Sequence, residues 1–357
     1  MRVLHVVCDG NPGGGTSVVL NLTTALAKQG CEVAILTSSG SHLSRESIRV
    51  GVQVFVGPLF GGPSSAYGAA RTIQKCIASY KPDIVHLHGS RAAFYFRLSL
   101  SPHEAVVYTV HGLHFAHKET VKRCVGKVLE RFSMHRVDQP IFVCKFDLEI
   151  AKEMGIKFRS LEPEVIYNGF EVSQASSESP TPKRVVYIGR LVYQKDPLLM
   201  VEVASLLAED GFTFEFIGGG PLLGEVQKRI SELGLDFAVR LKGNVTHDEA
   251  LRALAESSYA ILTSRWEGLP VAMIEAMSLG VAVIVPDICG IPEVISSGKT
   301  GYLVHSRDPR EFAVAIRTAE ADPSRLEICQ RGRHLVSEMF SNHEFISQHM
   351  RVYQKFL

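Results

Sequence analysis

The chain has 357 residues, of which 46% are hydrophobic and 21% charged, and its formal net charge is +1. This composition is typical of globular proteins, and the length predicts two domains with separate hydrophobic cores. The near-zero net charge argues against a nucleic-acid-binding protein, which would need a strongly basic surface. No stretch approaches the roughly 18 consecutive apolar residues of a membrane-spanning helix, so none is expected.

The cysteines and the N-terminal segment both indicate a cytoplasmic protein. Seven cysteines are scattered along the chain without a C-x-x-C pair, which is typical of reduced and mostly buried thiols. Residues 1–10, MRVLHVVCDG, contain a short apolar run that His5 interrupts and Asp9 and Gly10 end. This pattern predicts a first buried strand and not a signal peptide.

The first half of the chain alternates segments typical of strands and of helices. Residues 2–7 predict a strand, and residues 13–30 predict a glycine loop followed by a helix that Gly30 terminates. Further strands are predicted at residues 31–37, 82–89, 105–112, 139–144 and 163–169, with a helix at residues 69–80. Such alternation predicts a parallel sheet with helices on both faces.

The second half repeats this alternation after a segment of different composition. Residues 171–183 are rich in Ser and Pro and predict an interdomain linker. Strands are then predicted at residues 184–191, 212–220, 238–245, 259–265 and 281–287, and helices at residues 197–209, 221–233, 247–256 and 270–279. We predict an α/β protein with two facing, doubly wound, Rossmann-like domains, residues 1–170 and 184–340. Residues 341–357 predict a helix that closes back towards the first domain, and ligands are expected in the cleft beyond the strands' carboxyl ends.

Two basic residues follow the first strand of the second domain. Arg190 and Lys195 stand in the loop IGRLVYQKDP, residues 188–197. A guanidinium can bind an anion through two hydrogen bonds and an ammonium adds a point charge, so the pair could clamp a phosphate group. The spacing alone is equally compatible with two solvated loop charges.

Two glutamates flank the start of an apolar helix in RWEGLPVAMIEAMSLG, residues 265–280. Pro270 suits the first helical position, and the free N–H groups of a helix start can bind an anion. Glu267 would precede the helix, and Glu275 would lie about five residues inside it, roughly 7 Å further along. A diphosphate at the helix tip would then have one carboxylate near each end, ready to accept hydrogen bonds from sugar and ribose hydroxyls. Alternatively, Glu267 only favours the helix dipole and Glu275 is an exposed helical residue, although its apolar neighbours argue against full exposure.

The first domain offers a glycine loop and histidines at strand ends. NPGGGTSVV, residues 11–19, lets a ligand approach the backbone at a helix start, but it lacks the dinucleotide-binding and P-loop patterns. His88 and His111 end predicted strands and can donate to sugar or phosphate oxygens. A metal site is the alternative, with five candidate ligands: His86, His88, His111, His114 and His117. No H-x-x-x-H or H-E-x-x-H spacing supports it.

Together these segments resemble the retaining glycosyltransferases of family 4, which have the two-domain GT-B architecture. GGGTSVVLNLTTALAKQGCEV resembles the family's N-terminal glycine loop and helix, VIYNGF the segment before the linker, and GRLVYQKDP the phosphate-clamping motif. EFIGGGPLLGEVQKRI, LKGNV, SRWEGLPVAMIEAMSLGVAVIV and CGIPEVI match the second domain in order and spacing. The resemblance covers almost the whole chain.

The resemblance implies a role for each candidate residue. Arg190 and Lys195 would neutralise the donor diphosphate, and Glu267 and His111 would lie beside the donor sugar and the reacting bond. The other donor-binding residues would be Gly14 at the phosphate, Glu275 at the ribose, Gly268 and Leu269 after Glu267, Asn244 and Val245 near the base, and Gly218. No metal and no other cofactor is expected, because cationic side chains and helix ends supply the positive charge. Thr16 and Ser17 depart from the family's common acidic–basic pair, which leaves the donor undefined.

The implied reaction moves a sugar, with retention of anomeric configuration, from a nucleotide-diphosphate sugar to a saccharide or polyprenyl-diphosphate-linked saccharide. A UDP-sugar donor and a place in polysaccharide biosynthesis are expected. Two alternatives stay open: a nucleotide-sugar 2-epimerase of related fold and a non-catalytic nucleotide-sugar-binding subunit. An epimerase would lack the E-x7-E turn and need no acceptor. Retention of Arg190, Lys195, Glu267 and Glu275 together argues against a non-catalytic subunit.

The N-terminal domain is expected to meet the acceptor. Residues 1–170 contain 19 Lys and Arg against 13 Asp and Glu, whereas the remainder contains 19 against 24. Residues 117–136 predict an amphipathic helix with basic flanks, near the aromatic and basic segment 91–98. A core-facing apolar stripe is favoured over docking on anionic lipid, but the basic rim suits a membrane-held acceptor. We therefore expect a cytoplasmic protein that can contact the inner face of the membrane through residues 91–136.

Overall fold

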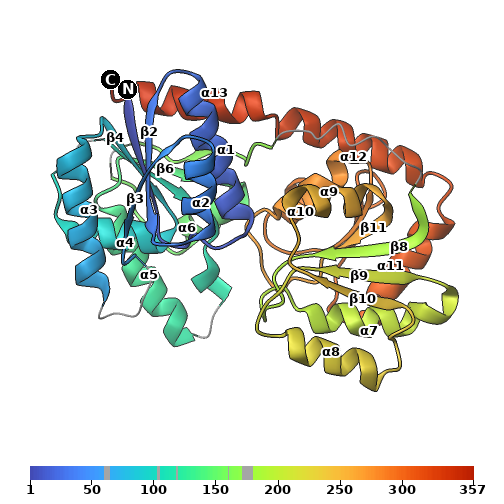
Figure 1. Ribbon diagram of the computed structural model, residues 1–357. Helices are drawn as coiled ribbons and strands as arrows, with labels where there is room; N and C mark the ends of the chain where they lie inside the picture. Colours follow the sequence, from blue (N-terminus) through green and yellow to red (C-terminus); the bar gives the residue numbers. More distant parts are fainter. Residues whose placement is uncertain (60–64, 103–104, 118–119, 160, 171–179) are drawn as a thin grey trace. The chain divides into compact units, whose positions relative to one another are not determined.

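The structure is a computed structural model that describes residues 1–357 except 60–64, 103–104, 118–119, 160 and 171–179 (Figure 1). The chain divides into two compact units. Unit 1 comprises Met1–Phe170 and Asn342–Leu357, and unit 2 comprises Glu171–Ser341. Most of the predicted linker lies outside the described residues, and its last three residues begin the first strand of unit 2.

Unit 1 contains a seven-stranded sheet in the order β3-β2-β1-β4-β5-β6-β7. Its strands are β1 (Arg2–Val7), β2 (Glu32–Ser38), β3 (Gln53–Gly57), β4 (Ile84–His88), β5 (Val106–Val110), β6 (Gln139–Phe142) and β7 (Glu164–Val165). Its helices include α1 (Gly14–Lys28), α2 (His42–Arg49), α3 (Ala66–Tyr80), α4 (Ser90–Ser99), α5 (Thr120–Met134), α6 (Lys145–Glu153) and α13 (Asn342–Gln354). All strand pairs are parallel, and the direction of winding reverses between β1 and β4.

The C-terminal helix α13 packs on unit 1, although the chain reaches it from unit 2 (Figure 1). Asn342 at its start exchanges side-chain hydrogen bonds with Asn21 of α1, at 2.7 and 3.1 Å. Near its end, the hydroxyl of Tyr353 lies 2.6 Å from Nδ1 of His86 in β4. Gly169 leaves room for Phe345, because an added Cβ would come within 2.4 Å of that side chain.

Unit 2 contains a second parallel sheet of six strands in the order β10-β9-β8-β11-β12-β13. Its strands are β8 (Thr181–Ile188), β9 (Thr213–Ile217), β10 (Val239–Gly243), β11 (Ser257–Ile261), β12 (Ala282–Pro286) and β13 (Tyr302–Val304). Its helices include α7 (Pro197–Leu207), α8 (Leu223–Glu232), α9 (His247–Ala255), α10 (Val271–Ser278), α11 (Pro309–Ala321) and α12 (Arg325–Met339). The two sheets confirm the predicted α/β class, and the winding of unit 2 reverses between β8 and β11.

The predicted amphipathic helix is present as α5, but the prediction that its apolar stripe faces the core is wrong. Val121 is 75% exposed and Val128 is 63% exposed. The residues that α5 buries are Glu130, Ser133 and Met134. The side of α5 that packs on the unit is polar because it meets Tyr108, whose hydroxyl donates to Oε1 of Glu130 at 2.8 Å.

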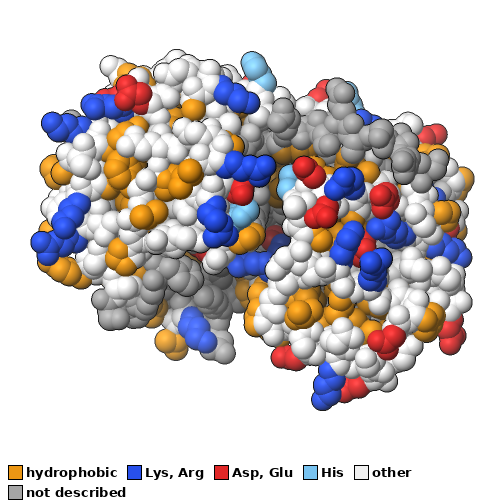
Figure 2. Space-filling model, viewed as in Figure 1, with side chains coloured by type: hydrophobic (Ala, Val, Ile, Leu, Met, Phe, Trp, Pro, Cys, Tyr) orange, Lys and Arg blue, Asp and Glu red, His pale blue; other side chains and the backbone are white. Residues whose placement is uncertain are grey.

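The surface of unit 1 carries the basic character that its composition predicts. Figure 2 shows Lys and Arg side chains spread over unit 1 with fewer Asp and Glu among them, whereas both signs are interspersed on unit 2. Within the described part of the chain, no helix combines the length and apolar character needed to cross a membrane.

Candidate active site

The candidate residues of unit 2 follow two neighbouring strands at the point where the winding reverses. β8 ends at Ile188 and β11 at Ile261, and the two strands pair with each other. The loops that follow them leave the same edge of the sheet and diverge towards helices on opposite sides. In doubly wound sheets such a switch point forms the ligand-binding crevice.

Backbone and side-chain hydrogen bonds hold these two loops together. The backbone N–H of Arg265 donates to the carbonyl of Gln194 at 2.8 Å, and the amide of Gln194 donates to the carbonyl of Trp266 at 3.0 Å. The hydroxyl of Thr263 donates to the carbonyls of Lys195 and Asp196 at 3.0 and 2.9 Å. The loop after β8 and the loop before α10 therefore form one structure.

Lys195 and Glu267 meet in this structure as an ion pair. Nζ of Lys195 lies 2.5 Å from Oε1 of Glu267, and the hydroxyl of Ser264 donates to the same oxygen at 2.5 Å. The side chains are 20% and 8% exposed, so water screens the pair only weakly. The sequence predicted Lys195 at a phosphate and Glu267 at a sugar. The structure brings the two side chains into direct contact with each other.

A second ion-pair cluster supports the same loop, and the sequence analysis did not include it. Oδ2 of Asp196 lies 2.7 Å from Arg265 and 2.5 Å from Arg307. Arg307 also donates to the backbone carbonyls of Thr263 and Ser264, both at 2.8 Å. Asp196 has a left-handed backbone with φ of 45°, a conformation that Asp tolerates better than most residues. The KDP sequence ahead of α7 was the available signal, but nothing in the sequence pointed to Arg307.

Arg190 is exposed, and its guanidinium has no hydrogen-bond or ion-pair partner among the residues that the structure describes. Its backbone is held by the glycine turn after β9. Gly218 has φ of 131°, and an added Cβ would lie 2.1 Å from the carbonyl oxygen of Gly189. An added Cβ at Gly220 would lie 2.4 Å from the carbonyl oxygen of Leu191. Gly218, predicted to bind the donor, therefore has a steric role in positioning the loop that carries Arg190.

Glu275 is partly buried on α10, which contradicts the reading as an ordinary exposed residue. Its side chain is 13% exposed, and burial raises its pKa to about 7. Pro270 is the residue before the helix, which begins at Val271 and not at Pro270 as predicted. Gly268 and Leu269 are buried in the turn between Glu267 and the helix. The free N–H groups of the first helical turn thus lie between the two glutamates along the chain.

Asn244 and Val245 follow β10, on the outer side of the glycine turn. The side-chain nitrogen of Asn244 would lie 2.9 Å from a Cβ added to Gly219. β10 pairs with β9, and β9 with β8, so the ends of three adjacent strands carry Asn244, Gly218 and Arg190. The predicted donor-binding residues of unit 2 therefore lie in the loops and the helix that follow the carboxyl ends of its strands.

Unit 1 carries its candidate residues at its own switch point. Gly14 opens α1 and is exposed, and no acidic residue stands in the first helical turn. His111 directly follows β5 and is half-buried. Its Nε2 lies 3.1 Å from Nδ1 of His88, and Nε2 of His88 lies 3.0 Å from Nδ1 of His5. Three rings therefore form a chain of hydrogen bonds from the core to the strand end.

This histidine chain restricts which nitrogens can carry protons. Each contact between two ring nitrogens needs one protonated and one bare nitrogen, so all the rings must be oriented in the same sense. Nε2 of His5 is buried and has no partner among the described residues. A buried acceptor without a partner is tolerated better than a buried donor, which favours protons on Nδ1 of His5 and of His88. Nε2 of His111 then accepts, and its proton lies on Nδ1.

The described residues do bring three histidines close enough to share an ion: His5, His86 and His88. Both ring nitrogens of His86 already form hydrogen bonds, Nδ1 with Tyr353 and Nε2 with Thr109 at 2.7 Å. The group therefore fits a hydrogen-bonded stack better than a metal site. The side chains of His114 and His117, two other ligands of the metal alternative, lie outside the described residues.

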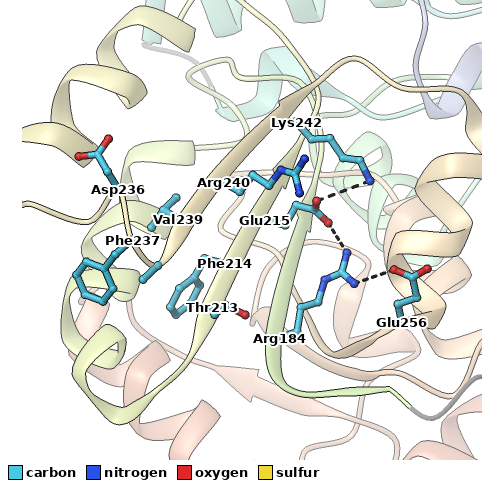
Figure 3. Close-up of a pocket in the computed structure, with 11 residues that line it drawn as sticks. Arg184, Thr213, Phe214, Glu215, Asp236, Phe237, Val239, Arg240, Lys242 and Glu256 are labelled. Carbon is cyan, nitrogen blue, oxygen red and sulfur yellow. Dashed lines mark hydrogen bonds and ion pairs between the residues drawn. The ribbon is translucent and has the colours of Figure 1, made fainter.

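A pocket of about 610 Å³ lies elsewhere in unit 2, along the first halves of β8, β9 and β10 (Figure 3). Its charged side chains neutralise one another. Arg184 lies 2.6 Å from Glu215 and 2.8 Å from Glu256, and Lys242 lies 3.7 Å from Glu215. Thr213 and Val239 line the pocket at the starts of β9 and β10, whereas Arg190 and Asn244 follow the carboxyl ends of β8 and β10. Lys242, two residues before Asn244, extends the lining towards those carboxyl ends.

Comparison with known proteins agrees with this arrangement. A model of Glycosyltransferase Family 4 matches residues 12–174, and a model of Glycosyl transferases group 1 matches residues 170–334. The two matches run through most of both units. The chain is a glycosyltransferase whose first half resembles Family 4.

Two curated relatives cover most of this glycosyltransferase. It is 27% identical over 267 residues to the UDP-Gal:alpha-D-GlcNAc-diphosphoundecaprenol alpha-1,3-galactosyltransferase of Escherichia coli, with 69% of this chain and 68% of the relative covered. It is 29% identical over 332 residues to the GDP-mannose:cellobiosyl-diphosphopolyprenol alpha-mannosyltransferase of Xanthomonas oryzae, with 88% and 85% covered.

Among solved structures, Anabaena HepE in complex with UDP-glucose matches with a TM-score of 0.84 at 18% identity, over 99% of this chain and all of HepE. The sucrose-phosphate synthase of Thermosynechococcus elongatus matches with a TM-score of 0.82 at 17% identity, over 99% of this chain and 98% of the synthase. These matches confirm the predicted GT-B fold.

Proposed function

We propose that this glycosyltransferase moves a sugar from a UDP-sugar to a saccharide carried on a polyprenyl diphosphate, in bacterial polysaccharide assembly. The observation that carries the proposal is the joined pair of loops in unit 2, where Lys195 pairs with Glu267 ahead of α10 and Glu275 is partly buried on that helix. The two curated relatives act on diphosphopolyprenol-linked saccharides, and HepE binds UDP-glucose. Both curated relatives support the acceptor class. The galactosyltransferase and HepE support UDP as the nucleotide, whereas the mannosyltransferase uses GDP-mannose.

The donor is proposed to lie with its diphosphate at the helix start. Arg190 and Lys195 would neutralise the phosphates, together with the N–H groups of Gly268 and Leu269. Glu275 would accept hydrogen bonds from the ribose hydroxyls, and Glu267 from the sugar. The base would lie beside Asn244 and Val245, at the end of β10.

Unit 1 is proposed to contribute the N–H of Gly14 and the ring of His111. The N–H of Gly14, at the positive end of α1, would donate to a phosphate oxygen. In the tautomer that the histidine chain favours, Nδ1 of His111 carries a proton, which would donate to an oxygen of the sugar or phosphate. Both groups donate without a formal negative charge, so they add to the stabilisation of the departing diphosphate.

The proposed reaction retains the anomeric configuration and needs no metal ion. The sugar–phosphate bond breaks first, and the acceptor hydroxyl attacks from the same face and gives its proton to the leaving phosphate. Glu267 is engaged by Lys195 and Ser264, which argues against its use as a covalent nucleophile. Catalysis would come from positioning and from positive charge at the leaving group.

Substitution of the basic residues tests the proposal. Arg190→Ala should lower turnover by about 100-fold or more with unchanged thermal unfolding, since it removes charge from the leaving diphosphate. Lys195→Ala should lower turnover to a similar extent, and it should also lower the unfolding temperature, because it leaves the buried carboxylate of Glu267 without its partner. Lys228→Ala is the matched control, because Lys228 is 78% exposed on α8 and away from these loops. Near-normal turnover in both site variants would overturn the assignment.

The donor and the reaction class are tested by binding and by product analysis. In a thermal-shift panel of nucleotide sugars and free nucleotides, UDP compounds should stabilise the enzyme most, by mass action. With nucleotide sugar alone, the sugar should keep its configuration at C2, and transfer should require an acceptor. Conversion of the nucleotide sugar without an acceptor would indicate an epimerase, and tight binding without any turnover would indicate a binding subunit.

A further inference from the structure

The outer face of α5 is the part of unit 1 that the proposed donor site does not explain. Val121, Val125, Val128 and Phe132 recur at helical spacing and form one stripe along the helix. These side chains are 75%, 54%, 63% and 37% exposed. Leu129 is 42% exposed beside them, and Cys124 is also exposed. An apolar stripe of this length on a surface helix indicates a partner that covers it.

The orientation of α5 is the reverse of that of an ordinary surface helix. Such a helix turns its apolar side to the core and its charged side to water. Here the carboxylate of Glu130 is buried against Tyr108, on roughly the opposite side from Val121 and Val128. Within unit 1 the ring of Phe132 lies 6.1 Å from that of Phe94, whereas Val121, Val125 and Val128 stay exposed, so packing within the unit does not explain those three valines.

Basic residues border the stripe on both sides. Helical spacing places Lys122 on one side, and Lys127 and Arg131 on the other. Within Thr120–Met134, Glu130 is the acidic residue, and it is buried. Arg97 of α4 adds a further cation, 4.6 Å above the ring of Phe132. The accessible surface of α5 thus combines an apolar centre with a positive rim.

We propose that α5 docks on the surface of an anionic phospholipid bilayer. The helix would lie parallel to the membrane, with its apolar stripe at the boundary between headgroups and acyl chains and its Lys and Arg side chains at lipid phosphates. This surface deepens the proposed function, because it holds the enzyme where a polyprenyl-linked acceptor resides. The docking itself rests on α5 and not on the donor site.

A second copy of the chain fits this face less well than a bilayer. A two-fold dimer through α5 would place the basic rim of one helix beside that of the other. No accessible carboxylate of α5 is available to neutralise those charges. An anionic membrane supplies the complementary charge that a second copy lacks.

Cys124 allows the docking to be measured on the intact chain. It is the exposed cysteine among the seven, so an environment-sensitive maleimide dye will label it preferentially, and Cys124→Ser gives the background. Addition of vesicles of phosphatidylcholine with about one-third phosphatidylglycerol should shift the dye emission to the blue. Vesicles of phosphatidylcholine alone should give a much smaller shift, and salt should weaken the binding to anionic vesicles. No shift with anionic vesicles at low salt would overturn the proposal.

Substitutions separate the apolar and the charged contributions. The double variant Val125→Asp, Val128→Asp should lower vesicle partitioning about 100-fold or more, because it replaces apolar side chains with charges that the anionic surface repels. The double variant Lys122→Gln, Lys127→Gln should lower it about 30-fold, at roughly 5-fold per cation. Val314→Asp on α11 is the matched control, since Val314 is 53% exposed in unit 2 and should leave partitioning unchanged. Equal partitioning of all three variants would refute the role of α5.

Light scattering and transfer assays distinguish the remaining outcomes. A dimer in the absence of vesicles, made monomeric by Val125→Asp, Val128→Asp, would show that the face binds a second copy and would overturn membrane docking. The same variant should transfer sugar normally to a water-soluble saccharide acceptor. If vesicle binding fails while this transfer persists, the docking is wrong and the proposed function stands. If the unmodified enzyme transfers no sugar but still binds vesicles, the proposed function is wrong and the membrane docking stands.

Discussion

Acidification is predicted to unfold unit 1 at a pH where unit 2 is still folded. Four buried histidines in unit 1 carry this prediction: His5, His86, His88 and His349. Burial lowers the pKa of His5 to about 3 and that of His349 to about 4, and it lowers the pKa values of His86 and His88 well below 6.5. The unfolded chain binds protons at these positions below about pH 6.5, whereas folded unit 1 does not. Their contribution to stability is therefore complete above pH 6.5 and is lost as the pH falls.

The magnitude follows from the number of protons. Each proton bound only by the unfolded state costs about 1.4 kcal/mol per pH unit, so four histidines cost about 5 kcal/mol per pH unit once they are protonated in the unfolded chain. Burial raises the pKa of Glu130, which acts in the opposite direction and offsets up to one of these protons. Between pH 6.5 and 5, unit 1 should lose about 5 kcal/mol, which is comparable to the whole stability of many domains.

Unit 2 should respond in the opposite way in part of this range. The pKa of Glu275 is about 7 in the folded unit, above the ordinary value of 4.5. Folded unit 2 therefore binds a proton between pH 7 and 4.5 that the unfolded chain releases, and acidification through that window stabilises it. Trp266, the single tryptophan of the chain, belongs to unit 2. Its fluorescence reports the unfolding of unit 2, and far-UV circular dichroism reports both units.

Urea titrations at pH 7.5, 6.5, 5.5 and 5 provide the assay. The dichroism transition of unit 1 should move steeply to lower urea, while the Trp266 transition should not. His349→Gln should reduce the pH slope of unit 1 by about 1.4 kcal/mol per pH unit, because it removes one of the four protons. His135→Gln is the matched control, since His135 is exposed in the same unit. A dichroism transition that stays constant from pH 7.5 to 5 would refute the reasoning.

Two further predictions concern unit 2. Ribose hydroxyls would favour the ionised form of Glu275, so UDP affinity should rise between pH 6 and 8 and binding at pH 7 should release protons. Calorimetry in buffers of different ionisation enthalpy measures this release. Glu275→Gln should abolish both effects, and unchanged proton release in that variant would remove Glu275 from the site. Gly218→Ala should destabilise unit 2 by about 3 kcal/mol or more, because the new Cβ would overlap the Gly189 carbonyl at a positive φ. Gly224→Ala is the control and should be near neutral, since a Cβ there meets nothing within 4 Å. Equal urea midpoints for the two variants would contradict this steric argument.

The fold could be predicted from the sequence where hydrophobic patterns were strong. The predicted strand at residues 2–7 is β1, and the predicted helix at 197–209 contains α7 and ends within two residues of it. Most other predicted strands agree with the structure to within a few residues. The strand predicted at 184–191 begins earlier, at Thr181, because β8 pairs with β11 from Ser257 onward. Edge strands such as β3 were not predicted, since their half-exposed sequences carry little apolar signal.

The site could be predicted from the sequence only in part. Local patterns predicted Arg190, Lys195, Glu267 and Glu275 as site residues, because each belongs to a motif that follows a strand, and the structure brings Lys195 and Glu267 together. They could not identify Arg307, which reaches Asp196 from far along the chain. Nor could they orient α5, because periodicity defines an apolar stripe but not the side that faces the protein. The burial of Glu130 against Tyr108, together with that of Ser133 and Met134, decides that orientation.

The two units stabilise polar groups at their switch points by opposite chemistry. Unit 1 uses neutral rings that hydrogen-bond in series, from His5 through His88 to His111. Unit 2 uses ion pairs, in which Lys195 meets Glu267 and Asp196 meets Arg307. Neutral rings donate and accept hydrogen bonds without adding net charge, whereas each ion pair of unit 2 holds a charged side chain in a fixed position.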